Sequence, residues 1–353
     1  MQVSLLPFIR KEMLHILRDR RTMLVVIAIP LLLIFLFGFT VSTDVRDIRI
    51  AVCAPVRSHT VEESVNRLAY SPYFTFRGYM DPSDIDRSLR RGDVSAVVVF
   101  AGDYASSGNY QILLDGADVN TAATSEIFIR SVIQDRAGAA SPVRMHMIYN
   151  PGMKSAYNFV PGLLGMILLL ICTMMTSVSI VKEKETGTME VLLVSPVKPI
   201  YIIISKMIPY LLFGCLDLAL ILLLARYALG VPLSGGVLTI SLVSILYIIL
   251  ALSLGMMVSN VADSQITALL ISAMVMMMPV LFFSGLLFPI NNLPWVLRWI
   301  SYVIPARWYI DAMRKMMIEG VGLGGVLLET GILLMETIVL IAASTKKFND
   351  RLQ

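Results

Sequence analysis

The polar residues of this 353-residue chain are not arranged as an enzyme active site would require. Serine, histidine and aspartate residues are present but unclustered, and the glycine pattern of a nucleophile elbow does not occur. The three histidines, His15, His59 and His146, have no cysteine or histidine neighbours at the spacing of metal ligands. We therefore predict no catalytic residue, no directly bound cofactor and no metal site.

The polar segment best suited to binding lies between two long apolar runs, at residues 182–206. The run before it ends in alternating charges, and Thr186 and Gly187 then permit a turn. Residues 188–194 are compatible with a short helix closed by the prolines that follow. Three apolar side chains, Met189, Leu192 and Leu193, would suit a groove on a soluble partner, and Glu190 would set the register through a polar contact. An ordinary helical hairpin on a membrane surface is the alternative interpretation.

Two carboxylates, Asp217 and Glu336, lie near the middle of apolar runs. A carboxylate in the middle of a membrane span costs about 2.5–3.5 kcal/mol, so each must face protein or water. No basic residue is obviously placed to neutralise either of them. Each is interpreted as a polar point on a transport or gating surface, or as a group that hydrogen-bonds between helices.

Another apolar run contains a cluster of flexible and aromatic side chains: Met274, Met276, Met277, Met278, Phe282 and Phe283. Such side chains suit a cavity that accepts varied apolar molecules, and Met277, Phe282 and Phe283 are therefore candidate path residues. Plain helix packing explains the same residues and is the favoured interpretation. Gly162 and Gly165, in an earlier run, would allow close approach of helices, including those of a second chain.

Composition places these residues in a membrane protein. Hydrophobic residues make up 57% of the chain and charged residues 15%, and the mean hydropathy is +0.76, which is too apolar for a soluble domain. The net charge of +4 is small and unevenly placed. It favours orientation in a membrane and argues against binding to nucleic acid.

Six apolar runs are long enough to cross a bilayer as helices. They are residues 23–41, 160–181, 207–229, 237–258, 266–288 and 326–343. Basic residues precede the first run and follow the last, so residues 1–22 and the tail 344–353 are predicted to be cytoplasmic. The charged loop 182–206 then lies inside. We therefore expect a polytopic α-helical membrane protein with six transmembrane helices.

Two segments flank the spans at the membrane surface. Residues 1–22 have an apolar face and a basic remainder, which predicts an amphipathic interfacial helix next to anionic membrane lipids. Residues 289–325 are rich in aromatic residues and interrupted by prolines. They are expected outside, either as re-entrant helices or as a surface amphipathic helix.

The less apolar stretch 42–159 is expected to form an inserted extracytoplasmic α/β domain. Its predicted strands are residues 48–54, 74–80, 96–100, 110–114 and 145–149, and its predicted helices are 61–68, 82–91 and 121–136. Two roles fit such a domain. It either extends the exit path and docks a periplasmic adaptor, or acts as a structural cap that stabilises a dimer.

Two motifs resemble a known family. EKETGTMEVLLVSPV, at 183–197, strongly resembles the loop between the second and third spans of ABC-2 type exporter permeases. SGLLFPINNLPWVLRWISYVIPARWYIDAMR, at 284–314, resembles the segment that follows the family's fifth span. The resemblance also takes in the amphipathic start and the inserted domain, and so covers nearly the whole chain. The inserted domain is its least specific part.

The resemblance implies that a coupling helix within residues 186–195 seats on a separate ABC nucleotide-binding subunit. The residues implied in this coupling are Glu183, Glu185, Thr186, Gly187, Thr188, Met189, Glu190, Leu192, Leu193 and Ser195. It also implies a second permease chain, identical or paralogous, with the export path between the two. The sequence has no Gly-Lys-Ser/Thr phosphate loop, so ATP and Mg are expected on the partner subunit.

These observations favour a permease subunit of an ATP-driven exporter in the bacterial cytoplasmic (inner) membrane. Its apolar spans suggest an amphipathic or lipid-like substrate such as a drug, a lipid or a peptide. A passive channel, or a membrane anchor that presents the external domain, is the alternative and predicts no dependence on a soluble ATPase. A membrane enzyme fits poorly, because the spans lack paired aspartates, histidine-rich motifs and a zinc-binding helix.

Overall fold

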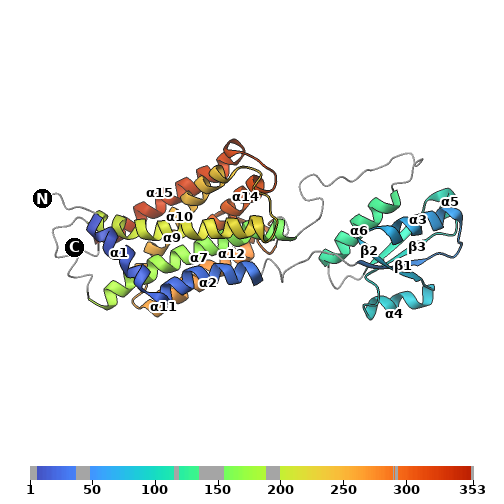
Figure 1. The fold of residues 1–353 in the computed structure, drawn as a ribbon, viewed down its shortest axis with the longest axis horizontal. Coiled ribbons are helices and arrows are strands. Elements are labelled where there is room, and N and C mark those ends of the chain that lie inside the picture. Colours follow the sequence, from blue (N-terminus) through green and yellow to red (C-terminus); the bar gives the residue numbers. More distant parts are fainter. Residues whose placement is uncertain are drawn as a thin grey trace. The chain divides into compact units, whose positions relative to one another are not determined.

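The chain folds into two compact units, each of which is described by itself. The computed structural model describes residues 6–36, 48–114, 119–134, 155–187, 199–288, 290 and 293–350. The larger unit combines Met1–Ser42 with Lys154–Gln353, and the smaller unit is Thr43–Met153. The smaller unit is thus inserted into the sequence of the larger one (Figure 1).

The larger unit is a bundle of helices (Figure 1). Its described α-helices are α1 (Leu6–Arg18), α2 (Arg20–Phe35), α7 (Ser155–Glu185), α9 (Pro199–Tyr227), α10 (Val237–Ser259), α11 (Gln265–Ile271), α12 (Met277–Phe283), α13 (Trp295–Tyr302), α14 (Pro305–Met317) and α15 (Leu327–Asp350). A π-helical segment, Ser272–Met276, joins α11 to α12, and a 3-10 turn, Leu323–Val326, precedes α15.

Five described segments are long and apolar enough to cross a membrane. They are Ala156–Glu185, Ile204–Tyr227, Val237–Ser259, Gln265–Phe283 and Leu323–Ser344. They coincide with the last five predicted spans, and the chain is therefore a polytopic helical membrane protein. The first predicted span, 23–41, overlaps α2, but its residues 37–41 lie outside the described part of the chain.

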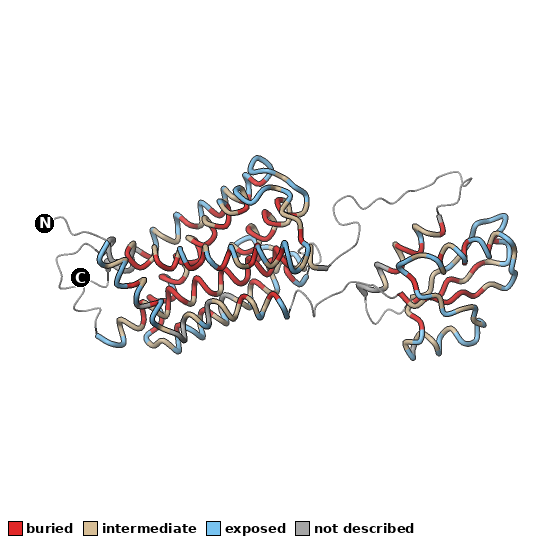
Figure 2. The backbone as a smooth tube through the Cα atoms, viewed as in Figure 1, coloured by how far each residue is buried: buried red, intermediate tan, exposed pale blue. Residues whose placement is uncertain are grey.

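Helix α7 is the centre of the bundle, because it packs against α9, α10, α11 and α14. Figure 2 marks most of its length as buried. Small residues bring its neighbours close: a Cβ atom on Gly255 of α10 would lie 2.6 Å from the carbonyl oxygen of Thr173. Gly165 lies against Tyr309 and Ile310 of α14. The predicted close approach at Gly165 therefore occurs within the chain.

The segment after the fifth predicted span contains two helices with opposite surroundings. Helix α13 is largely exposed, with Trp295 and Trp299 at its surface. Helix α14 is inserted among α7, α10 and α15. Its apolar face is fully buried, from Ala306 to Met317, while Asp311 and Lys315 lie on its half-buried side. A single amphipathic surface helix therefore does not describe the whole segment.

The smaller unit is an α/β fold with a four-stranded sheet in the order β2-β1-β3-β4. Its elements are β1 (Ile48–Cys53), α3 (His59–Tyr70), β2 (Phe74–Tyr79), a 3-10 turn (Pro82–Asp84), α4 (Ile85–Arg90), β3 (Ala96–Phe100), α5 (Tyr104–Ser107), β4 (Tyr110–Leu114) and α6 (Val119–Gln134). Strand β1 is parallel to β2 and β3, and β4 is antiparallel to β3. The predicted strand 145–149 lies outside the described residues.

The two faces of this sheet bury different helices, since successive strand residues point to opposite sides. Ile50 and Val52 of β1 pack in a cluster with residues of α3 and α6. Ala51 and Cys53, which alternate with them, pack in a cluster with Leu89 of α4. The β1 strand is therefore apolar at nearly every position, as expected for a strand covered on both faces.

Candidate functional site

The candidate site is the C-terminal end of α7, where the sequence reads Lys182, Glu183, Lys184 and Glu185. Successive residues of an α-helix are rotated by about 100° from each other, so neighbouring side chains leave the helix in different directions. The three residues Glu183, Lys184 and Glu185 each contact a different part of the bundle. This end of α7 leads directly into residues 188–198, which lie outside the described part.

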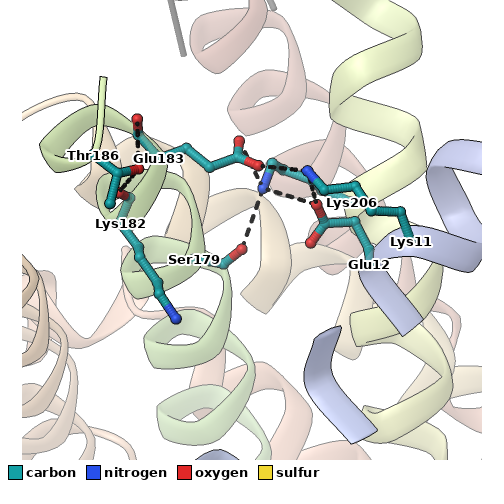
Figure 3. Close-up of polar contacts among 7 residues, drawn as sticks. All are labelled: Lys11, Glu12, Ser179, Lys182, Glu183, Thr186 and Lys206. Atoms are coloured by element: carbon teal, nitrogen blue, oxygen red, sulfur yellow. Dashed lines mark hydrogen bonds and ion pairs between the residues drawn. The ribbon is translucent and has the colours of Figure 1, made fainter. Parts of the chain in front are cut away.

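Glu183 belongs to an ion-pair cluster that joins α7 to α1 and α9 (Figure 3). The Lys206 Nζ atom of α9 lies 2.9 Å from Glu183 Oε2 and 3.6 Å from Glu12 Oε1 of α1. Lys206 also donates a hydrogen bond of 3.3 Å to the hydroxyl of Ser179. Lys11 Nζ lies 3.4 Å from both Glu12 and Glu183. Two ammonium groups and two carboxylates therefore balance each other.

The inner members of this cluster are withdrawn from solvent. The side chains of Lys206, Glu12 and Glu183 are 5%, 6% and 12% exposed, whereas that of Lys11 is 59% exposed. Removing one partner from such a pair leaves an uncompensated buried charge, at a cost of about 3–5 kcal/mol. The cluster therefore fixes the middle of α1, the C-terminal end of α7 and the first third of α9 relative to one another.

The next two residues attach α7 to the other side of the bundle. Lys184 Nζ donates a hydrogen bond to the carbonyl oxygen of Ser259, at the end of α10. The backbone N–H of Gln265 donates to Glu185 Oε1 at 2.9 Å, and the Gln265 side-chain amide donates to Glu185 Oε2. Glu185 thus places a negative charge at the N-terminus of α11, where the helix dipole favours it.

The end of α7 is closed by a turn. The Thr186 hydroxyl donates to the carbonyl oxygen of Lys182 at 2.9 Å, and the Gly187 N–H donates to that of Lys184 at 3.2 Å. Gly187 has a φ of +70°, a left-handed conformation that favours glycine at the end of a helix. The remaining predicted coupling residues lie outside the described part of the chain: Thr188, Met189, Glu190, Leu192, Leu193 and Ser195.

The carboxylates predicted in the spans lie apart from the cluster, in the interior of α9 and α15. Asp217 has no exposed surface, and neither of its carboxylate oxygens has a hydrogen-bond partner among the described residues. Glu336 is half-buried, and its Oε2 atom likewise has no hydrogen-bond partner there. These three carboxylate oxygens therefore accept no hydrogen bond from a serine or threonine of the described helices.

The predicted apolar path residues lie on α12, directly after the π-helical segment. Phe282 is 43% exposed, while Met277 and Phe283 are half-buried. The rings of Phe282 and Phe288 are parallel, with centroids 6.4 Å apart. The hydroxyls of Ser177 and Ser272 hydrogen-bond at 2.9 Å and connect the π-helical segment to α7. A π-helical turn inside an α-helix is frequently found at a functional position.

Sequence reasoning did not identify Glu12 or Lys206 as members of the site. Glu12 is the one acidic residue in the first 18 positions, and Ile9 and Ile16 lie three residues before it and four after it. It therefore lies on the same helix face as these apolar residues, which was the available signal. Lys206 similarly precedes a long apolar run, and its partner cannot be read from local spacing.

Comparison with known proteins gives a match over almost the whole chain. The family model described as "ABC-2 family transporter protein" matches residues 20–346. The chain is 27% identical over 328 residues to the "Probable multidrug ABC transporter permease YbhS" of Escherichia coli, covering 88% of this chain and 87% of that protein. It is 25% identical over 331 residues to the "Probable multidrug ABC transporter permease YbhR" of the same organism, covering 89% and 90%.

A eukaryotic relative matches a shorter part. The "ABC transporter G family member 20" of Dictyostelium discoideum is 29% identical over 220 residues, which are 62% of this chain and 30% of that protein.

Proposed function

Because the chain belongs to the ABC-2 family of transporter proteins, we propose that it is the membrane-spanning permease subunit of an ATP-driven exporter. The observation that carries this proposal is the attachment of the α7 end to four other helices by Glu183, Lys184 and Glu185. A segment that only turns at the membrane surface does not need consecutive residues attached to different helices.

The proposed topology has six spans. Helix α2 is the first of them, and the five segments given above are the others. Both termini lie in the cytoplasm, because Arg18, Arg20 and Arg21 lie before or at the start of the first span and Lys346 and Lys347 follow the last apolar run. The smaller unit then lies outside the bacterial cytoplasmic membrane, where it docks a periplasmic adaptor or stabilises a dimer.

The proposed coupling runs from the partner subunit into α7. A separate ABC nucleotide-binding subunit, which carries ATP and Mg, contacts residues 186–195. Its movement on hydrolysis shifts the end of α7. Glu183 transmits this shift to α1 and α9, and Glu185 transmits it to α11 and the π-helical segment.

The proposed path lies at the exposed apolar side of α11 and α12, opposite a second permease chain. Met278 and Phe282 of α12 are exposed to about half, although both are large apolar residues. Flexible thioethers and rings fit substrates of varied apolar shape, and the named relatives are multidrug permeases. We therefore assign an amphipathic or lipid-like cargo. Asp217 of α9 and Glu336 of α15 are candidate gating residues in the bundle.

The test is to purify the chain with a co-expressed nucleotide-binding subunit and to follow ethidium efflux and ATP hydrolysis in proteoliposomes. We expect ATP-dependent efflux, and we expect Glu183→Gln to reduce efflux more than it reduces hydrolysis. Glu126→Gln, in an exposed pair of the smaller unit with Arg130, is the matched control and should change neither. Ethidium flux without any ATPase would contradict the proposal and favour a passive channel.

A further inference from the structure

A groove lies between α9 and α10, near the ends that their connecting loop joins. Its volume is about 830 Å³. Leu218, Leu222 and Leu223 of α9 and Ile245 of α10 form an apolar wall, and Ser234 and Ser241 add two hydroxyl groups. This size and this mixture of many apolar groups with a few polar ones are typical of a small-molecule site.

The groove is held open by backbone contacts of the connecting loop. The N–H groups of Ser234 and Gly235 donate to the carbonyl oxygens of Met317 and Met316, at 3.1 and 2.8 Å. A Cβ atom on Gly235 would lie 2.6 Å from the Met316 oxygen, so only glycine permits this approach. Because α14 is itself buried in the bundle, the loop and the groove that it borders have a fixed position.

Arg226 gives the groove its charge. It is the one charged residue among the described residues that line the groove, and its side chain is exposed. No ion pair of Arg226 occurs within the described part of the chain. A guanidinium binds phosphate through two parallel hydrogen bonds, whereas the lining offers no carboxylate to receive an ammonium group.

We propose that this groove binds one anionic phospholipid. The phosphate lies on Arg226, with the hydroxyls of Ser234 and Ser241 as further donors, and an acyl chain lies along Leu222 and Leu223. A zwitterionic lipid binds more weakly, because its ammonium group adds a positive charge near Arg226 and the described lining has no carboxylate to balance it. The nearby Tyr227 is exposed, as is common for aromatic side chains at the level of lipid headgroups.

The position of the groove fits a lipid headgroup. Helix α9 runs from Lys206 in the ion-pair cluster to Arg226, twenty residues later, which corresponds to about 30 Å of helix. This distance is about the thickness of the hydrocarbon core of a bilayer. In the topology proposed above the lipid belongs to the outer leaflet, but the binding itself does not depend on the transport function.

Native mass spectrometry of the full chain in detergent tests the proposal. Phosphatidylglycerol and phosphatidylcholine with the same acyl chains are titrated separately, and the bound lipids per chain are counted. We expect one saturable phosphatidylglycerol site and weaker, unsaturated binding of phosphatidylcholine. Arg226→Gln should lower the phosphatidylglycerol affinity by about tenfold or more, since a charge-assisted hydrogen bond contributes about 1.5–3 kcal/mol.

A second variant tests the apolar part independently of the charge. Ala219 lines the groove and is exposed, so Ala219→Trp should fill it and remove the site while Arg226 stays in place. Ala343→Trp, at an exposed position of α15, is the matched control and should bind the lipid normally. Circular dichroism confirms that all variants are folded.

Three outcomes would overturn the proposal. Equal binding of the two lipids would show that lipid charge does not determine binding. An unchanged phosphatidylglycerol affinity in Arg226→Gln would show that Arg226 does not bind the phosphate. If Ala219→Trp instead converts a dimer into monomers and leaves the lipid count unchanged, the groove is a contact between two copies of the chain.

Discussion

The two ends of the bundle are held together by different physical interactions. At one end, α1, α7 and α9 meet through a charge cluster around Lys206. Toward the other end, α7, α10 and α14 meet through neutral rings: Tyr247 and Tyr309 stack with centroids 3.9 Å apart, and the Tyr247 hydroxyl donates to the Gly165 carbonyl oxygen at 3.0 Å. Lys11 of the charge cluster is exposed, whereas both tyrosines have no exposed surface.

We infer from this difference that the charged end transmits movement between helices and that the tyrosine end anchors the helices to one another. Glu12, Glu183 and Lys206 are costly to separate, because each would be left as a largely buried charge without its partner, so α1 and α9 should move together with the end of α7. A close-packed aromatic contact instead resists movement, since moving it opens a cavity. We therefore expect the charged end to follow the movement of a partner subunit, while the tyrosine end keeps its geometry.

The largest loss of stability is expected from Tyr309→Ala. Removing the ring leaves a cavity between α7, α10 and α14, and such substitutions of a buried aromatic residue cost about 3–5 kcal/mol. Thermal unfolding in detergent measures this loss. Tyr309→Phe keeps the ring and removes only the 2.7 Å hydrogen bond with Ser244, so its cost should be about 1 kcal/mol. Equal losses in the two variants would contradict anchoring by the ring.

The charged end is tested by a double-mutant cycle on Glu183 and Lys206. Each single change, Glu183→Gln or Lys206→Met, leaves a largely buried charge without its 2.9 Å partner and should cost about 3 kcal/mol. The double variant should recover more than about 1 kcal/mol of the summed loss.

The same variants distinguish the two ends in function. Drug-stimulated ATP hydrolysis should fall in both Glu183→Gln and Lys206→Met, but remain near its original value in Tyr309→Phe. Additive stability losses in the cycle would show that the two residues act independently, and would remove the cluster from the proposed transmission.

The bundle was largely predictable from the sequence, because long apolar runs determine membrane-crossing helices. The observed Val237–Ser259 differs from the predicted 237–258 by one residue. The charge cluster was not predictable, since its members come from three helices that are far apart in the sequence. Local spacing indicates that Glu12 faces the same side as Ile16, but it does not indicate which cation covers it.

The buried position of α14 was also beyond local reasoning. Its sequence has the spacing of an amphipathic helix, and that spacing is satisfied equally by a bilayer surface or by other helices. What decides between them is Gly165 on α7, which allows Tyr309 and Ile310 to approach closely. The sequence indicates that Gly165 permits close approach of a helix, but only the folded chain shows that this helix is α14.

A smaller effect is expected from the turn that ends α7. Gly187→Ala forces alanine into a left-handed conformation, which costs about 1–2 kcal/mol, although no atom of the described residues lies within 4 Å of the new Cβ. Drug-stimulated ATP hydrolysis should therefore decrease moderately. Gly108→Ala is a matched control in the smaller unit, with a φ of +69° and equally open space, and it should not affect coupling. A similar decrease in both variants would contradict a specific role of the α7 turn.

The smallest change in stability is expected from the ion pair of Lys315 and Glu329, which joins α14 to α15 at the tyrosine end. The Nζ atom of Lys315 and the Oε1 atom of Glu329 lie 2.5 Å apart, and the hydrogen bond that Lys315 donates to Glu329 raises the pKa of Lys315 above its usual 10.5. A raised lysine pKa means that the pair contributes fully below pH 10.5 and is lost as the pH rises through the folded-state pKa. The Lys315 side chain is 36% exposed, so solvent screens its ammonium group, whereas the Glu329 side chain is only 5% exposed and would be left as a largely buried charge if Lys315 were removed. The contribution should therefore be about 1 kcal/mol, which is less than that of the Glu183–Lys206 pair.

Thermal unfolding of the original protein and of Lys315→Met should therefore differ near pH 8 and converge above the raised pKa, where the original lysine is neutral as well. Lys315→Arg stays charged throughout this range, so its stability should not show the same decline. A constant difference between the original protein and Lys315→Met would mean that the lysine stabilises α14 through its alkyl chain. The stability of the tyrosine end would then come from packing alone, which would make it differ more clearly from the charged end.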